Sequence, residues 1–206
     1  MKNILFIFFA ICSSGFSSLA EDSLFIKVHF LYGSKPGKEF KASESNWFGG
    51  KLGGHVGIEI DSDRILNFVP SGKFHKFSKA DDRHSKFVFH TSSQFYSIFG
   101  GKPREVKQAV FIIPITSVQK RKLDSIAKVY TGNTPYDYAF FGMRCGAAAY
   151  DILGQLQIVE SYSHRKTYLK IFYPKKLRKR LFELAALNRW KTEMAQGSDH
   201  RIWEKD

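Results

Sequence analysis

The chain has 206 residues, of which 43% are hydrophobic and 25% are charged, a composition typical of one ordinary globular domain. This composition excludes both a disordered tail and a bundle of membrane-spanning helices. Lys and Arg number 32 and Asp and Glu number 19, so the formal net charge is +13, and polyanions such as nucleic acid, anionic lipid or cell-wall polymer are candidate partners.

The first twenty residues have the pattern of a secretory signal peptide. Lys2 precedes an apolar run over residues 4–12, and the small residues Ser18 and Ala20 stand just before an acidic start. The apolar run is too short to span a bilayer, which argues against a membrane anchor. We therefore predict cleavage after Ala20 and an exported protein, periplasmic or extracellular, with a single domain over 21–206.

Cleavage would leave Cys145 as the single cysteine of the mature chain, because Cys12 lies in the segment removed. A lipoprotein would use Cys12, but Ile11 before it is larger than the residue that lipidation sites usually carry. Exported proteins usually pair their thiols. An unpaired cysteine is then an intermolecular bridge, a buried bystander or a nucleophile.

Five segments rich in β-branched and aromatic residues, bounded by turn-forming residues, are predicted as strands. They are residues 23–30, 55–60, 64–68, 86–89 and 106–115. The Gly-, Ser- and Lys-rich stretch 33–54 is predicted as a long loop. Its Trp47 and Phe48 are candidates to line a substrate groove.

Helices are predicted later in the chain. A capping-box pattern from Thr116 to Gln119 opens the first, a second runs from near Gly142 to about residue 156, and a third begins at Pro174 and ends by Gly197. Strands followed by helices predict an α+β fold with an antiparallel sheet rather than a doubly wound parallel one.

The two strands joined by the turn at Asp61–Asp63 are predicted to form a hairpin with a polar face. A three-residue loop would place Gly57 opposite Asn67. Since side chains alternate along strands, His55, Gly57 and Asn67 then share one face, with open space at the glycine. Either Asn67 is an ordinary half-exposed amide, or it orients the His55 ring so that the ring can act as a base.

Cys145 is predicted near the start of the second helix. There the backbone N–H groups and the helix dipole favour a thiolate, which can attack a carbonyl while the N–H of Cys145 is offered to the oxyanion. However, Cys145 shares a helix face with Ile152, and free cysteine is among the most buried residue types. If Cys145 is a nucleophile at a helix start, the helix must be interrupted near Gly142, because a helix that began at Thr134 would place the cysteine in its middle.

The run HVGIEI from His55 to Ile60, with Asn67 twelve positions after the histidine and Cys145 at a helix start, resembles the circularly permuted NlpC-like branch of the papain-like cysteine hydrolases. This branch includes the lecithin retinol acyltransferase-like enzymes. The resemblance covers about residues 24–160 and leaves the basic C-terminal extension, about 161–206, outside it. It implies a papain-like α+β fold, an antiparallel sheet packed against helices, with an added basic C-terminal helix.

The same resemblance implies that Cys145 is the nucleophile, that His55 is the general base and later the acid, and that Asn67 orients the histidine. Family members often carry a second histidine at the third position, so Asn67 departs from the acyltransferase-like members but keeps the hydrogen-bonding role. Tyr136 and Tyr138 lie shortly before the cysteine, where tyrosines in related enzymes approach the reacting carbonyl. Alternatively, they pack the loop against the sheet.

These features predict an exported cysteine hydrolase that cleaves an amide bond, first of all in cell-wall peptides, without a cofactor. Lipid acyl transfer or ester hydrolysis on the same triad is the alternative within the enzymes. A non-catalytic, basic envelope-binding protein is the alternative from another class.

Four histidines are candidate zinc ligands: His55, His75, His84 and His90. No two of them have the helical or hairpin spacing that metal ligands usually show, and no second cysteine assists. No metal site is therefore predicted.

The third helix opens with a basic run that a polyanion could recognise. Its charged residues are Lys175, Lys176, Arg178 and Lys179. The alternative is an amphipathic helix that packs its leucines inward while the charges face water. No nucleic-acid-binding motif is present in the sequence, so nucleic acid is not expected as the partner.

Overall fold

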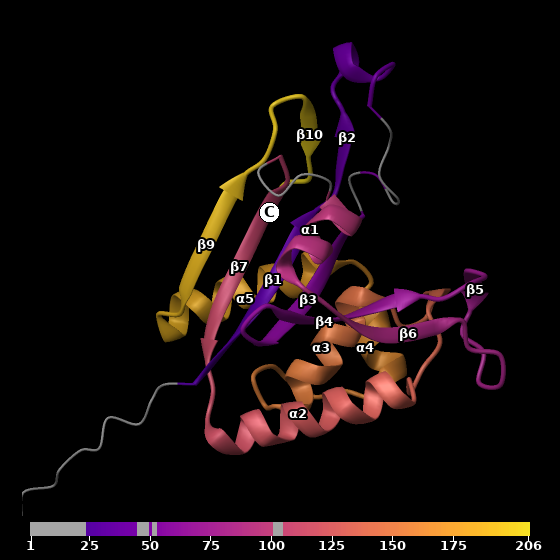
Figure 1. Cartoon of the computed structure of the whole chain (residues 1–206), viewed down its shortest axis with the longest axis vertical. Coiled ribbons are helices and arrows are strands. Elements are labelled where there is room, and N and C mark those ends of the chain that lie inside the picture. Colours follow the sequence, from indigo (N-terminus) through magenta and orange to yellow (C-terminus); the bar gives the residue numbers. More distant parts are fainter. Residues whose placement is uncertain (1–23, 45–49, 51–52, 101–104) are drawn as a thin grey trace, which may run out of the picture.

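The computed structural model describes residues 24–44, 50, 53–100 and 105–206. Within them the chain forms ten strands, five α-helices and a short 3-10 helix at Lys38–Phe40 (Figure 1). The strands are β1 (Phe25–Tyr32), β2 (Ser34–Pro36), β3 (Gly54–Asp61), β4 (Arg64–Pro70), β5 (His75–Phe77), β6 (Ser85–His90), β7 (Lys107–Pro114), β8 (Ala139–Phe141), β9 (Lys191–Gln196) and β10 (Arg201–Trp203). The helices are α1 (Ser92–Gly100), α2 (Ser117–Gly132), α3 (Cys145–Gln155), α4 (His164–Lys170) and α5 (Pro174–Asn188).

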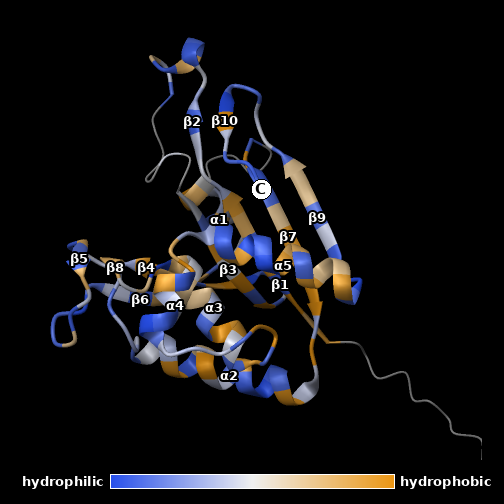
Figure 2. Cartoon of the chain, turned by 180° about the vertical axis from the view of Figure 1, so that it is seen from behind, coloured by the Kyte–Doolittle hydropathy of each residue, from blue (hydrophilic) through white to orange (hydrophobic). Residues whose placement is uncertain are grey.

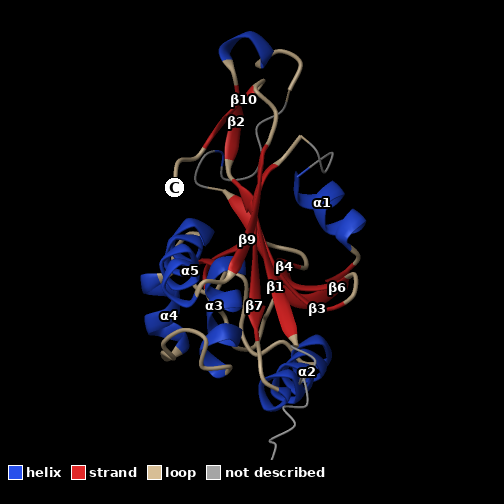
Figure 3. Ribbon diagram, turned by 90° about the vertical axis from the view of Figure 1, so that its left-hand side faces the viewer, coloured by secondary structure: helices blue, strands red, loops and turns tan. Residues whose placement is uncertain are grey.

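A six-stranded antiparallel sheet in the order β6-β4-β3-β1-β7-β9 forms the centre of the fold. Two small sheets stand apart from it, β2 with β10 in antiparallel fashion and β5 with β8 in parallel. In Figure 3, α3, α4 and α5 lie on one side of the large sheet and α1 lies on the other. The predicted α+β class with a mostly antiparallel sheet is confirmed.

The larger hydrophobic cluster occupies the sheet face that α2, α3 and α5 cover. Val28, Val56 and Leu66 contribute from the strands, and Leu153 and Leu181 contribute from the helices. Figure 2 shows this distribution, with hydrophobic colouring along β1 and β7 and hydrophilic stretches on α5. Because successive strand residues point to opposite faces, the residues between these core positions face α1.

The hairpin of β3 and β4 has the predicted register, but it reaches that register through a different turn. The turn is the two-residue pair Ser62–Asp63, and Asp61 pairs with Arg64. Asp63 adopts a left-handed φ of 59°, as tight hairpin turns require. A β-bulge between Glu59 and Asp61 then shifts the pairing by one residue, so Gly57 lies opposite Asn67.

Two of the predicted helices begin where the local signals place them. Thr116 and Gln119 form a complete capping box at the start of α2, and Pro174 is the first residue of α5. The predicted break near Gly142 is also confirmed, because β8 ends at Phe141 and α3 begins only at Cys145.

The predicted extent of the third helix is wrong. Helix α5 ends at Asn188, where Arg189 takes a left-handed φ of 57°. The chain then returns as β9, which pairs with β7 at the edge of the large sheet. The C-terminal extension is thus half helical, and part of it belongs to the central sheet.

Some predictions fall outside the described residues. These are the signal peptide over residues 1–20 and the aromatic pair Trp47 and Phe48. In the part of the chain that is described, no helix combines the length and the apolar character needed to cross a membrane.

Candidate active site

His55 and Asn67 meet on the polar face of the hairpin, as the register predicts. The Nε2 atom of His55 lies 3.2 Å from the Oδ1 atom of Asn67, and both side chains are buried. A carboxamide oxygen only accepts hydrogen bonds, so Nε2 carries the proton and Nδ1 is left with a free lone pair. This is the tautomer in which Nδ1 can accept a proton.

The orientation of the Asn67 amide is set by its other contacts. Its Nδ2 atom lies 3.3 Å from the carbonyl oxygen of Ile65, 3.2 Å from that of Val88 and 3.1 Å from Nδ1 of His90. All of these atoms can accept hydrogen bonds, so the nitrogen must face them and the oxygen must face His55. Asn67 on β4 thus links two histidines on the strands that flank it, His55 on β3 and His90 on β6.

Helix α1 covers the His55 ring. Phe99 stacks on the ring with the centroids 3.8 Å apart and the planes at 16°, and Phe95 lies at 5.6 Å. Burial lowers the pKa of His55 from its ordinary value of 6.5 to about 4, although the bond to Asn67 acts in the opposite direction. The ring is therefore neutral at pH 7.

The open space expected beside Gly57 is absent, and this expectation is corrected. A Cβ atom built on Gly57 would lie 2.5 Å from Cγ2 of Ile65 and 2.8 Å from Cε2 of Phe95. The glycine therefore admits the Phe95 ring from α1 rather than a substrate.

Cys145 is the first residue of α3, and Arg144 before it has an extended backbone. The N–H groups of Gly146 and Val56 and the hydroxyl of Tyr138 lie near enough to the sulfur to lower the pKa of the thiol. Val56 directly follows His55 in β3, so the sulfur lies beside the peptide bond that joins the two residues.

Val56 lies where β3 and β4 separate, because the pairing between the two strands starts at Gly57. Cys145 belongs to the larger hydrophobic cluster, on the sheet face that α3 covers, whereas the His55 ring packs against α1 on the other face. The site therefore spans the sheet at this edge of β3. In the described structure the ring bonds to Asn67 and makes no hydrogen bond to the sulfur.

The electrostatic setting of Cys145 combines opposing effects. Burial raises the pKa of the thiol, while the positive charge of Arg144 and the donors Tyr138, Gly146 and Val56 lower it. The effect of burial dominates, so the resting sulfur is a neutral thiol. The helix start alone does not produce a thiolate, and reaction requires a base.

The two candidate tyrosines have different surroundings. Tyr138 lies near the cysteine sulfur, where its hydroxyl lowers the pKa of the thiol, and it also stacks on Phe68. Tyr136 packs against Phe68, Tyr130 and other aromatic rings of the core. Tyr138 is therefore the one placed beside the nucleophile candidate, while the third candidate, Trp47, lies outside the described residues.

The structure adds residues that the sequence patterns did not single out for this site. His90 bonds to Asn67 from β6, and Phe99 covers His55 from α1. Arg144 places its guanidinium 3.9 Å from the centroid of the Phe172 ring, and its Nη2 atom is buried with no hydrogen-bond partner in the described structure. A capping-box pattern at residues 91–94 is the one local signal that could have located α1.

The basic run of α5 is only partly a surface feature. Arg178 has no exposed surface and bonds to Glu204 at 2.8 Å and to Asp206 at 2.9 Å. Its expected role in a polyanion-binding patch is therefore corrected to an internal ion pair. Lys176 and Lys179 are exposed and Lys175 is half-buried, so binding through these three lysines stays a prediction.

A pocket of about 330 Å³ borders the segment that leads to Cys145. Tyr136, Met143 and Tyr168 are among its lining residues.

Searches against protein-family models, curated proteins and solved structures each found no significant match.

Proposed function

We propose that this chain is an exported cysteine hydrolase of the papain-like, circularly permuted NlpC-like type that cleaves an amide bond. The observation that carries the proposal is that the Cys145 sulfur lies near the N–H of Val56, the residue that follows His55, whose tautomer is set by its bond to Asn67. A nucleophile, a base and an orienting group are the three parts that nucleophilic amide cleavage needs.

In the first step, with the His55 ring brought to the sulfur at the edge of β3, the Cys145 thiol passes its proton to Nδ1 of His55 and the sulfur attacks the amide carbonyl carbon. The carbonyl oxygen gains negative charge, and the N–H groups at the start of α3 and the Tyr138 hydroxyl are the nearby donors for it. The C–N bond then breaks, and the amine leaves with the proton from the His55 imidazolium. The product on the enzyme is a thioester.

In the second step, His55 takes a proton from water, and the resulting hydroxide equivalent attacks the thioester carbonyl. The C–S bond breaks, the carboxylic acid leaves, and the proton returns to the sulfur. With a pKa of about 4, the His55 ring is neutral across the neutral pH range, so the lone pair of Nδ1 is not protonated there.

Cell-wall peptides are the first substrate class, because the N-terminal twenty residues have the pattern of an export signal. The test incubates the purified protein with cell-wall peptide fragments and, separately, with phospholipid vesicles, and identifies the acyl group on Cys145 by mass spectrometry. A peptidyl adduct supports amide cleavage. A fatty acyl adduct rejects it in favour of lipid acyl transfer.

Cys145→Ala is the negative control, and Cys145→Ser is the matched variant in which a hydroxyl group of similar size replaces the thiol. The proposal requires that both lose hydrolysis while their unfolding temperatures stay near that of the unmodified protein. If Cys145→Ala keeps every activity and charge reversal at Lys175, Lys176 and Lys179 removes binding to anionic polymer, the protein is a basic envelope-binding protein instead.

A further inference from the structure

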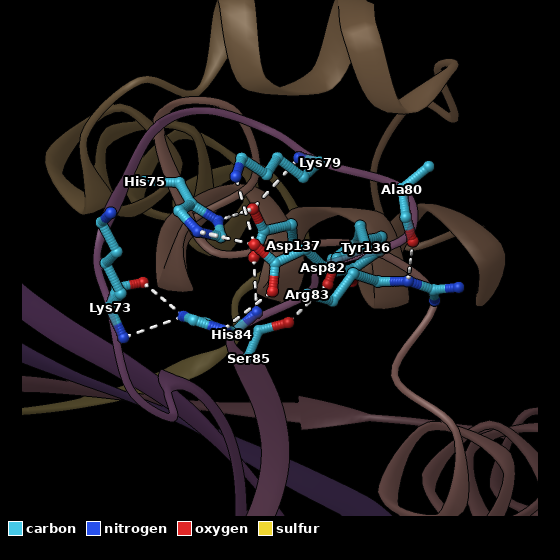
Figure 4. A network of polar contacts seen from close by, with 10 residues as sticks. All are labelled: Lys73, His75, Lys79, Ala80, Asp82, Arg83, His84, Ser85, Tyr136 and Asp137. Atoms are coloured by element: carbon cyan, nitrogen blue, oxygen red, sulfur yellow. Dashed lines mark hydrogen bonds and ion pairs between the residues drawn. The ribbon is translucent and has the colours of Figure 1, made fainter.

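Three potential metal ligands converge at β5 and the loop that connects it to β6. His75, Asp82 and His84 each direct one nitrogen or oxygen atom to a common point, and these atoms all lie within 4.8 Å of one another. Figure 4 shows the three side chains together with Asp137, which reaches them from the segment before β8. None of them takes part in the site described above.

His75 carries the unexplained feature of this cluster. Its ring is buried, with 4% of the side chain exposed, and its Nδ1 lies 2.6 Å from Oδ2 of the fully buried Asp137. The carboxylate can only accept, so Nδ1 holds the proton and Nε2 has a free lone pair. Nε2 is buried with no hydrogen-bond partner in the described structure, and Oδ2 of Asp82 faces it at 3.7 Å.

Asp137 is held firmly in its orienting position. Besides the His75 ring, its carboxylate accepts the backbone N–H of Lys79 at 3.1 Å and that of His84 at 2.9 Å. A carboxylate that fixes a histidine by one ring nitrogen while the other nitrogen points to an open site is the usual arrangement behind metal-binding histidines.

His84 supplies the second nitrogen. Its Nε2 lies 3.0 Å from Oδ1 of Asp82. Its Nδ1 lies 2.9 Å from the backbone nitrogen of Lys73 and 3.2 Å from the carbonyl oxygen of Lys73, so the surroundings accept either tautomer. With the proton on Nδ1 and bonded to that carbonyl, Nε2 is free to bind a cation.

We infer that His75, Asp82 and His84 bind a divalent transition metal ion of the Zn²⁺ type, with Asp137 as the residue that positions His75. Two imidazole nitrogens and one carboxylate oxygen are ligands that Zn²⁺ favours, and three protein ligands leave a fourth position for water. Zn–ligand bonds of about 2.0–2.2 Å place tetrahedral ligand atoms about 3.3 Å apart. The ligand atoms lie within 4.8 Å of one another, so a movement of about 1.5 Å by the side chains of Asp82 and His84, which reach the surface, brings them to that spacing.

Lys79 opposes the ion in the metal-free protein. Its ammonium group lies 3.1 Å from Oδ2 of Asp82 and is half-exposed, so it neutralises the carboxylate but is free to swing into water. Removing Lys79 should therefore strengthen metal binding, whereas removing a ligand should weaken it. Opposite effects of the Lys79 variant and the ligand variants on metal affinity would distinguish a specific site from general attraction of the ion to the protein surface.

The position of the site connects it to the segment that leads to Cys145. His75 pairs with Ala139 across the parallel β5–β8 ladder, and Asp137 directly precedes Tyr138, which lies near the cysteine sulfur. A bound ion would thus brace the segment 137–143. The metal site does not depend on Cys145 being a nucleophile.

The test uses the full chain, freed of metal by chelation and dialysed. Zn²⁺ binding is measured by titration calorimetry, and Co²⁺ is added as a spectroscopic probe whose visible absorption reports tetrahedral geometry. We expect one ion per chain, a rise in unfolding temperature with Zn²⁺, and at least tenfold weaker binding in Asp82→Asn and in His84→Gln. Lys79→Ala should bind more tightly than the unmodified protein.

His200→Gln is the matched control, because His200 is also half-exposed and near carboxylates but lies outside the cluster. Asp82 and His84 are chosen over His75 because their surface positions let the variants fold, which circular dichroism verifies. The inference is overturned if Co²⁺ gives no tetrahedral spectrum, if Zn²⁺ affinity is unchanged in both ligand variants, or if His200→Gln weakens binding equally.

Discussion

The buried, neutral His55 ring makes the stability of the protein depend on pH in a defined way. Its pKa is about 4 in the folded protein, whereas the ordinary value is 6.5. This difference of about 2.5 corresponds to about 3 kcal/mol in the free energy of unfolding. At pH 7 the ring is neutral in both states, so the stabilisation is fully present. As the pH falls below 6.5, the unfolded chain takes up a proton that the folded chain refuses, and stability is lost until the pH reaches about 4.

Between pH 7 and pH 5 the expected loss from this one residue is about 2 kcal/mol. The assay is urea unfolding at both pH values for the unmodified protein and for His55→Gln, which keeps a donor for Asn67 but does not titrate. Other titrating groups contribute equally to both proteins and cancel in the comparison. The loss on acidification should therefore be about 2 kcal/mol smaller in His55→Gln.

His200→Gln serves as the control, because it makes the same replacement at a half-exposed histidine. An equal loss of stability in His55→Gln and in the unmodified protein would refute the reasoning. So would a His55 pKa near 6.5 in an NMR titration of the folded protein, because the ring would then be solvated rather than covered by Phe99.

Three further predictions concern stability and are measured by denaturant unfolding. Gly57→Ala should destabilise by about 1–3 kcal/mol, because its Cβ would come within 2.5 Å of Ile65; an unchanged midpoint would show that α1 does not pack on this position. Arg178→Met should destabilise by about 3–5 kcal/mol because it strands the buried Glu204 carboxylate, and recovery is expected when Glu204→Gln is added; a surface-like effect below about 0.5 kcal/mol would contradict the internal ion pair. Thr116→Ala should cost about 1 kcal/mol through loss of the α2 cap, whereas no change would mean that the cap is replaced by solvent.

The features that could be predicted from the sequence are those with local causes. The capping box at Thr116 and the proline at position 174 mark helix starts through a few neighbouring residues. The pairing of Gly57 with Asn67 followed from alternation along two short strands, although a bulge rather than a three-residue loop produces it. The class of the fold followed from the order of these elements.

The features that were missed depend on distant partners. Strand β9 is polar and exposed along much of its length, so nothing in its own pattern indicates pairing with β7. Arg178 is buried only because Glu204 and Asp206 come back to it from the end of the chain. The sequence run around it resembles any solvated basic helix face.

The histidine cluster was missed for the same reason. His75 in β5 and His84 in the loop that follows are nine positions apart, and their third partner is an aspartate rather than a cysteine or histidine. Only the pairing of β5 with β8 and the reach of Asp137 across 62 positions bring the group together. Helix α1 is different, because its capping residues Thr91 and Gln94 were a readable signal.

The pairing of Cys145 with His55 is tested most directly by the rate of alkylation of the thiol by iodoacetamide as a function of pH. Cys145 is the free cysteine of the described residues and would be the single cysteine left after the predicted cleavage at Ala20, which makes the signal specific. Because the thiol pKa is raised and the His55 ring is neutral above about pH 4, the account predicts a rate that depends only weakly on pH between 5 and 8, with His55 accepting the thiol proton. In His55→Gln the rate should fall about tenfold for each pH unit below the thiol pKa. Identical profiles in the two proteins would show that His55 does not act on Cys145 and would contradict the proposed hydrolase.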